Sequence, residues 1–128
     1  MISVQTLAIY DTEISSSIPP EIGLCSELRN LYLHMNKLKG PIPHELGKLQ
    51  KLTSLLLWGN SLTGTILPEL SNCSMLVVFD LSANELSGQI PRELGKLTVL
   101  EELHLSENLL TGPIPPELSN CTSHSDSA

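Results

Sequence analysis

Four residues of the sequence have the types and spacing from which a hydrolase triad could be assembled: Asp80, Ser82, His104 and Ser106. The repeat described below places Asp80 and His104 one turn apart on the same face of a sheet, with the two serines beside them. A triad also needs an oxyanion hole and a cleft that excludes water, and a shallow concave sheet offers neither. We therefore interpret these residues as a solvated polar patch and predict that the chain is not an enzyme.

A row of carboxylates recurs every 24 residues, at Glu21, Glu45, Glu69, Glu93 and Glu117. Carboxylates are calcium ligands, but calcium takes about six to eight oxygen atoms and the sequence supplies no convergent carbonyl loop. Each glutamate instead lies at the start of a predicted helical turn, where the helix dipole favours a negative charge. We predict a structural role for this row, with no metal ion and no cofactor.

The cysteines are spaced 48 residues apart, at Cys25, Cys73 and Cys121. They share a column of the repeat with Leu49 and Leu97, so we expect buried free thiols. Two coils separate neighbouring cysteines, which is beyond the roughly 7 Å Cα limit of a disulfide and excludes a shared zinc ion.

Two asparagines begin N-glycosylation sequons, Asn72-Cys73-Ser74 and Asn120-Cys121-Thr122. Both occupy the same position of the repeat. We predict glycans at Asn72 and Asn120, on the outer surface of the molecule rather than on its sheet.

The element that positions all of these residues is a 24-residue repeat with the pattern LxxLxLxxNxLxGxIPxELxxLxx. We assign repeats to residues 4–27, 28–51, 52–75, 76–99 and 100–123, which form one domain at 1–123, and a polar tail to 124–128. Alternate residues of LxL point to opposite faces of a short strand, so the leucines face inward. No single copy can cover its own apolar face, whereas stacked copies can.

The predicted fold is therefore an α/β leucine-rich solenoid: a right-handed coil with a parallel concave sheet and short 3-10 helical turns on its convex side. The asparagine column should form an internal ladder of hydrogen bonds to adjacent backbone, through Asn36, Asn60, Asn84 and Asn108. Three residues do not match the repeat pattern: Thr12, Ser16 and Leu67.

Charge and composition exclude several classes of partner. Seven Lys and Arg against fourteen Asp and Glu give a net charge of −7, which opposes binding to nucleic acid or to anionic lipid. No run approaches the roughly 18 apolar residues that span a bilayer, and the first residues lack the features of a signal peptide. The chain itself is not expected to insert into a membrane.

Recognition is expected on the concave face, where the outward residues vary between repeats. Three of the four aromatic residues lie there, and aromatic side chains dominate binding energy at interfaces. The alternative is that these rings merely pack on each other across coils. The predicted ligand-binding residues are Tyr10, Tyr32, His34, Leu56, Trp58, Asp80, Ser82, Glu102, His104 and Ser106. An extended peptide with its basic part toward the acidic end fits this surface.

The stretches GPIPHELGKL (40–49) and GQIPRELGKL (88–97) resemble the plant-specific leucine-rich repeat of receptor-like kinase ectodomains and of polygalacturonase-inhibiting proteins. Residues 25–38, 52–62 and 76–88 are most similar to the receptor subgroup that perceives root meristem growth factor peptides. The resemblance implies a ligand-perceiving glycoprotein ectodomain on the extracellular side of the plasma membrane or in the apoplast. Its parent protein would carry a membrane span and a Ser/Thr kinase, whose motifs this chain lacks.

Several alternatives remain open beside this reading. A secreted inhibitor of a microbial wall-degrading enzyme, acting in defence, is the second hypothesis. Ice binding would need a regular array of exposed Thr or Asn, which the concave columns lack.

The expected partners are a peptide or protein ligand and a co-receptor. The paired-cysteine caps of the family are absent, so we expect a fragment or truncated product that self-associates through its uncapped ends.

Overall fold

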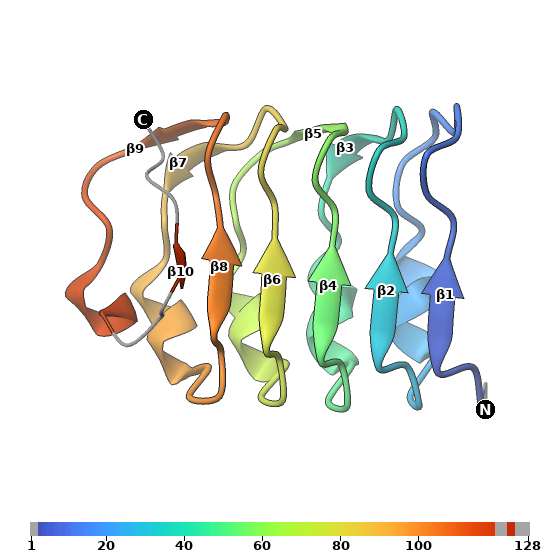
Figure 1. Cartoon of the computed structure of the whole chain (residues 1–128), viewed down its shortest axis with the longest axis horizontal. Coiled ribbons are helices and arrows are strands. Elements are labelled where there is room, and N and C mark those ends of the chain that lie inside the picture. The colour runs from blue at the N-terminus through green and yellow to red at the C-terminus, as the bar shows by residue number, and fades with distance from the viewer. Residues whose placement is uncertain (1–2, 120–122, 125–128) are drawn as a thin grey trace.

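The computed structural model describes residues 3–119 and 123–124 of the chain, which form a solenoid of stacked coils. One face is a parallel sheet with the strand order β1 (Thr6–Ala8), β2 (Asn30–Tyr32), β4 (Ser54–Leu56), β6 (Val78–Asp80), β8 (Glu102–His104) and β10 (Ser123–His124). Figure 1 shows this main sheet in front of a row of short helices, with β1 and β10 at its opposite edges. The predicted parallel-sheet solenoid is confirmed.

Strand register follows the repeat. Leu31 lies opposite Leu55, Leu55 opposite Phe79, and Phe79 opposite Leu103. All four side chains are fully buried, and the inward leucines and isoleucines of the other columns form one continuous core with them. Each coil thus hides its apolar face against the next, which is the main source of stability in a solenoid.

Short 3-10 helices line the opposite side, as expected: η1 (Pro20–Leu24), η2 (His44–Lys48), η3 (Pro68–Asn72), η4 (Arg92–Lys96) and η5 (Pro116–Leu118). Each carries one of the repeated glutamates in its first turn. Adjacent helices approach closely: a Cβ added to Gly47 would lie 2.5 Å from the carbonyl oxygen of Glu69. None of the helices in the described part of the chain has the length and hydropathy needed to cross a bilayer.

Two additional small sheets, which the repeat pattern did not predict, lie along the flank of the solenoid. β3 (Lys39–Pro41) pairs with β5 (Ser61–Thr63), and β7 (Ser87–Gln89) pairs with β9 (Leu109–Thr111), both in parallel. Gly40 and Gly88 in these strands have φ values of +80° and +78°, where a side chain would be strained. The repeated glycine therefore bends the chain from the flank toward the helical side.

The last described residues continue the main sheet. β10 pairs with β8 so that Ser123 lies opposite Glu102, an offset of 21 residues instead of the 24 between other neighbours. His124, the first residue of the predicted polar tail at 124–128, belongs to this strand. At the other end, Val4 and Ile9 of the first coil are 41% and 39% exposed.

Candidate ligand-binding face

The asparagine ladder holds the C-terminal ends of the main-sheet strands together. Asn84 Nδ2 donates to the carbonyl oxygens of Leu57 (3.0 Å) and Leu81 (3.1 Å), and its Oδ1 accepts from Leu62 N at 3.0 Å. The ladder asparagines bridge adjacent coils in the same way, through Asn36, Asn60, Asn84 and Asn108. In the first coil Thr12 takes this position, and its N–H and hydroxyl both donate to Asn36 Oδ1.

The residue before each ladder position has left-handed backbone, although only Gly59 is a glycine. Met35, Ala83 and Glu107 have φ values of +57°, +56° and +56°. Gly59 itself has φ +72°. This turn ends each strand at the same level, so the outward residues that precede it form straight columns across the coils.

The column that begins at Tyr10 is an aromatic row. The ring of His34 stacks on Tyr10, with centroids 4.5 Å apart and planes 12° apart, and on Trp58, at 5.0 Å and 17°. Tyr32 meets the edge of His34 at 6.3 Å. The structure thus shows that these aromatic side chains pack laterally across the coils. The lateral packing also makes the row rigid, since each ring is supported by its neighbour.

His34 is the partly buried centre of this row. Burial lowers the pKa of its imidazole, and this effect outweighs the carboxylates of Asp80 and Asp11, which raise it. Its Nδ1 is buried and has no hydrogen-bond partner among the described residues. A proton on Nδ1 would therefore lack an acceptor, so the neutral ring is expected to carry its proton on Nε2.

The polar patch does not form a triad. Asp80 and His104 are opposite each other in the register of β6 and β8, yet their side chains bond within their own coils. Asp80 Oδ1 accepts from Ser82 N (3.0 Å) and Ser82 Oγ (2.6 Å). His104 Nε2 pairs with Glu102 Oε1 at 3.1 Å.

The remaining predicted site residues lie where the repeat placed them. Tyr32 and Leu56 end β2 and β4, are partly buried, and flank the aromatic row. Ser106 continues the column after Ser82 and is partly buried. The main sheet thus brings all ten predicted residues onto one surface.

The cysteine column is largely interior. Cys73 is buried, its thiol donates to the carbonyl oxygen of Leu46 at 3.2 Å, and burial raises its pKa to about 11. Cys25 is partly buried and, like Cys73, is a free thiol. Asn72 is exposed at the end of η3, on the helical side. Cys121 and Asn120 lie outside the described residues.

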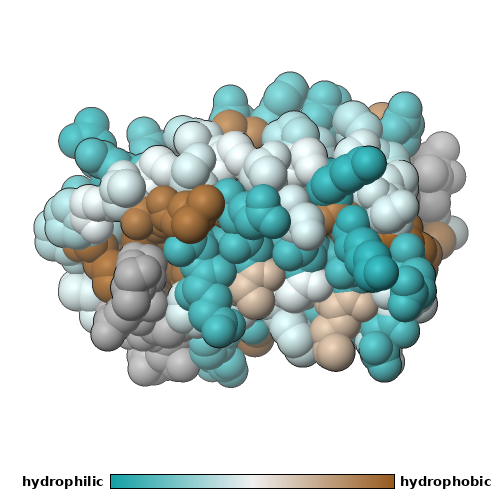
Figure 2. All heavy atoms as spheres, turned by 90° about the horizontal axis from the view of Figure 1, so that it is seen from above, coloured by the Kyte–Doolittle hydropathy of each residue, from teal (hydrophilic) through white to brown (hydrophobic). Residues whose placement is uncertain are grey.

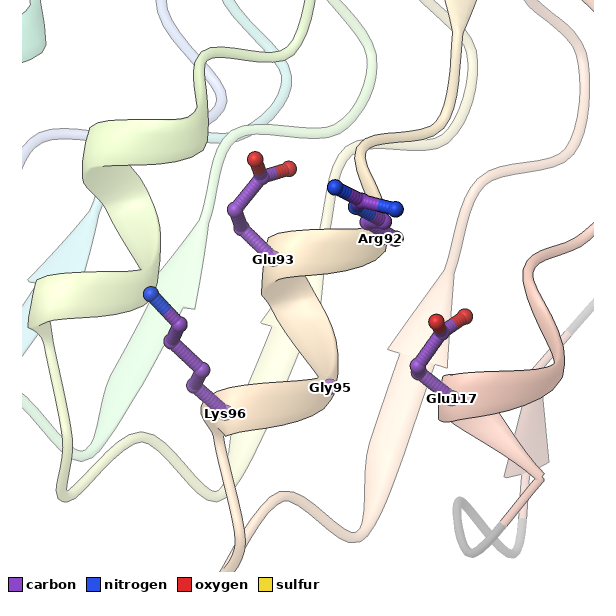
Figure 3. A pocket seen from close by; sticks show the side chains of 5 residues that line it. All are labelled: Arg92, Glu93, Gly95, Lys96 and Glu117. Carbon is purple, nitrogen blue, oxygen red and sulfur yellow. The ribbon is translucent and has the colours of Figure 1, made fainter.

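Other surface features are less suited to recognition. Between η4 and η5 lies an open hollow of about 490 Å³ lined by Arg92, Glu93, Gly95, Lys96 and Glu117, whose charged side chains spread apart rather than converge (Figure 3). Figure 2 shows the flank beyond the strand ends, where hydrophobic atoms gather toward the end that carries β9. Leu109 of β9 is 64% exposed. Within the described part of the chain, no group of three His, Cys, Asp or Glu residues is arranged to hold a metal ion.

The sequence model of the leucine-rich repeat matches four segments of the chain: residues 27–49, 51–73, 75–97 and 99–121. The chain belongs to the leucine-rich repeat family. Among solved structures, it is similar to the plant peptide hormone receptor RGFR1 in complex with RGF2, with 52% identity and a TM-score of 0.92 over 97% of this chain. This agrees with the resemblance to receptor ectodomains described above.

Two further structures show how broadly the fold is used. The ectodomain of the receptor kinase GASSHO1/SCHENGEN3 from Arabidopsis thaliana, in complex with CASPARIAN STRIP INTEGRITY FACTOR 2, is 43% identical over 96% of this chain, with a TM-score of 0.92. A plant ice-binding protein is 35% identical over 92% of this chain and 38% of its own length, with a TM-score of 0.87. The chain spans only 20% of the RGFR1 chain and 15% of the GASSHO1/SCHENGEN3 chain.

Proposed function

We propose that the outward face of the main sheet is a peptide-recognition surface and that the chain is part of the ligand-perceiving ectodomain of a plant receptor-like kinase. The observation that carries this proposal is the aromatic row of Tyr10, His34 and Trp58, stacked into one rigid surface beside the acidic residues Asp80 and Glu102. Rigid aromatic side chains lose little entropy on binding and supply much of the energy at peptide interfaces. The complexes of RGFR1 and GASSHO1/SCHENGEN3 support a peptide as the ligand.

The ice-binding relative shows that the repeat alone does not select a function. The column Tyr10, His34, Trp58, Ser82 and Ser106 has no regular spacing of threonine or asparagine, which disfavours ice binding. Catalysis is disfavoured too, because Asp80 and His104 are each engaged by other side chains. We therefore propose a non-catalytic recognition role on the extracellular side of the plasma membrane.

The test is peptide binding by the 128-residue chain and its Trp58→Ala variant, measured by calorimetry with RGF2 and CASPARIAN STRIP INTEGRITY FACTOR 2 as probes. We expect at least one of them to bind, and Trp58→Ala to weaken that binding by about tenfold or more. Leu24→Ala is the control, since Leu24 is 59% exposed on η1, away from the main sheet. Failure of both peptides to bind, or equal affinity of Trp58→Ala, would contradict the proposal.

The exposed sequon at Asn72 belongs to the same proposal. A glycan there projects from the helical side and leaves the aromatic row accessible. Expression through a plant secretory pathway should add mass at Asn72, and the Asn72→Gln variant should lose that mass without losing peptide binding. An unmodified Asn72 in secreted protein would contradict this assignment.

A further inference from the structure

The aromatic row stops at Trp58. Along its column the next residues are Ser82 and Ser106, which are small, and no described ring stacks on the face of Trp58 that is turned away from His34. The backbone continues in the same register, because Gly59 N donates to the carbonyl oxygen of Ser82 at 3.0 Å. One ring-sized position of the row, above Ser82, therefore has no protein side chain to fill it.

A carboxylate lies beside this open position. Asp80 precedes Ser82 by two residues on the same strand face, and Ser82 N and Oγ fix its Oδ1. Its Oδ2 accepts no hydrogen bond from the described residues, and no described cation lies within ion-pair distance of it. The charge of Asp80 reaches the row itself, since it raises the pKa of His34 against the larger lowering by burial. The open position thus lies between the free face of Trp58 and the carboxylate of Asp80, of which only Oδ1 accepts hydrogen bonds from the described residues.

We propose that this position binds the side chain of an arginine in the peptide ligand, an assignment that rests on the function proposed above. The planar guanidinium stacks on the free face of Trp58 above Ser82, and its N–H groups donate to Asp80 Oδ2. A lysine ammonium has the charge but no plane to continue the row, and a phenyl ring has the plane but leaves Asp80 unpaired. Guanidinium is the side-chain group that is planar and stays charged at neutral pH, so it satisfies both neighbours.

The surrounding charge favours the same occupant. Glu102 on β8 is exposed and carries a second carboxylate near Asp80, although His104 occupies its Oε1. The whole chain has a net charge of −7, which attracts a cationic peptide. Arginine is also more weakly hydrated than lysine, so its transfer onto the half-buried Trp58 costs less.

The test uses three capped peptides, Ac-Gly-Arg-Gly-NH2 and its citrulline and lysine analogues, titrated into the intact chain. Trp58 is the only tryptophan, so its fluorescence and its indole N–H resonance report directly on the position. We expect the arginine peptide to shift both signals and to bind about fivefold or more tightly than either analogue. Citrulline keeps the plane without the charge, and lysine keeps the charge without the plane.

Asp80→Asn removes the charge but retains an oxygen that can accept from Ser82, and it should bring the arginine peptide down to the affinity of the citrulline peptide. Glu85→Gln is the matched control, because Glu85 is exposed in the same coil but outside the main sheet. Ser82→Phe should fill the position and abolish the response. Circular dichroism establishes that each variant is folded, and Asp80→Asn decides the result if Ser82→Phe does not fold.

Equal binding of the three peptides, an arginine preference that survives in Asp80→Asn, or no change at Trp58 would overturn the assignment. The outcome is separable from that of the proposed function. If RGF2 or CASPARIAN STRIP INTEGRITY FACTOR 2 binds in a Trp58-dependent way while the arginine peptide does not, the recognition surface stands and the arginine position is wrong. If no peptide binds, both are wrong.

Discussion

The rings of His34 and Trp58 lie face to face, 5.0 Å apart and 17° from parallel, on neighbouring coils of the solenoid. With Tyr10 on its other face, His34 is enclosed between two aromatic rings. The stack stabilises the contact between three coils, and under the proposed function it would also form part of the surface that binds the peptide.

Acid should destabilise the protein through His34. Its pKa in the folded state is lowered from 6.5, mainly by burial, so the unfolded chain binds a proton at a pH where the folded chain does not. The free energy of unfolding should therefore fall as the pH drops from about 6.5 through the folded-state pKa, and it should be unaffected by this residue above about pH 7. Urea denaturation across pH 5–8 measures this dependence.

The matched variant is His34→Phe, which keeps a ring in the stack and cannot titrate. It should flatten the pH dependence relative to the wild-type chain. His44→Gln serves as the control, because the His44 side chain is 62% exposed and makes no ring contact among the described residues. An identical pH profile in His34→Phe and wild type would show that His34 does not contribute.

Removal of a ladder side chain should be costly. Asn84→Ala leaves three carbonyl oxygens and the Leu62 N–H without this side-chain partner, in a position that is 8% exposed. We expect a loss of about 2–4 kcal/mol, because buried polar groups lose their partners without regaining water. Chemical denaturation measures it. Asn30→Ala removes an exposed bond to Thr6 Oγ1 and a long 3.5 Å bond from Thr53 Oγ1, and it should cost under about 1 kcal/mol.

Addition of one methyl group to Gly47 should separate two coils. The new Cβ would lie 2.5 Å from the carbonyl oxygen of Glu69, an atom fixed in the backbone of the next coil. We expect Gly47→Ala to destabilise the fold by about 1–3 kcal/mol, measured by thermal unfolding. Ser71, which is buried in the same column, already carries a Cβ, so Ser71→Ala should have a much smaller effect. Equal losses in the two variants would contradict this packing argument.

The two described cysteines should differ in reactivity. Burial raises the pKa of Cys73 to about 11, and its thiol is enclosed by the core, whereas Cys25 is partly exposed. Iodoacetamide at pH 8 should alkylate Cys25 much faster than Cys73 in the folded chain, as followed by peptide mass spectrometry. In denaturant the two rates should converge. Fast alkylation of Cys73 without denaturant would mean that the core around it opens readily.

Much of this fold follows from residue spacing alone. Leu31, Leu55 and Leu103 are buried because a 24-residue period puts them at the same point of every coil, and the ladder asparagines follow by the same logic. The flank sheets were not predicted, because a three-residue segment such as Lys39–Pro41 of β3 contains a glycine and a proline and has no apolar residue facing the core. Their pairing depends on how the glycine bend directs the chain.

On the main sheet, the sequence predicted which face each side chain occupies, but it did not predict which neighbour each side chain contacts. Asp80 has His104 beside it on the next strand and Ser82 two residues ahead on its own coil, and spacing does not decide between them. Ser82 prevails because its N–H and hydroxyl both reach the same oxygen. In the same way, the sequence placed Tyr10 and Trp58 on one face but did not identify His34 as the ring that joins them.

The parallel register of the main sheet imposes a mismatch of lengths on any extended ligand that crosses it. Neighbouring strands are separated by about 4.8 Å, whereas an extended peptide advances about 3.4 Å per residue, so ligand side chains of one orientation recur about every 6.8 Å. The distance between two such ligand side chains therefore equals about 1.4 strand spacings. Each side chain consequently lies at a different position relative to the nearest strand. Successive side chains of such a ligand would therefore meet different residues of a column in which Tyr10, His34, Trp58 and Ser82 all differ.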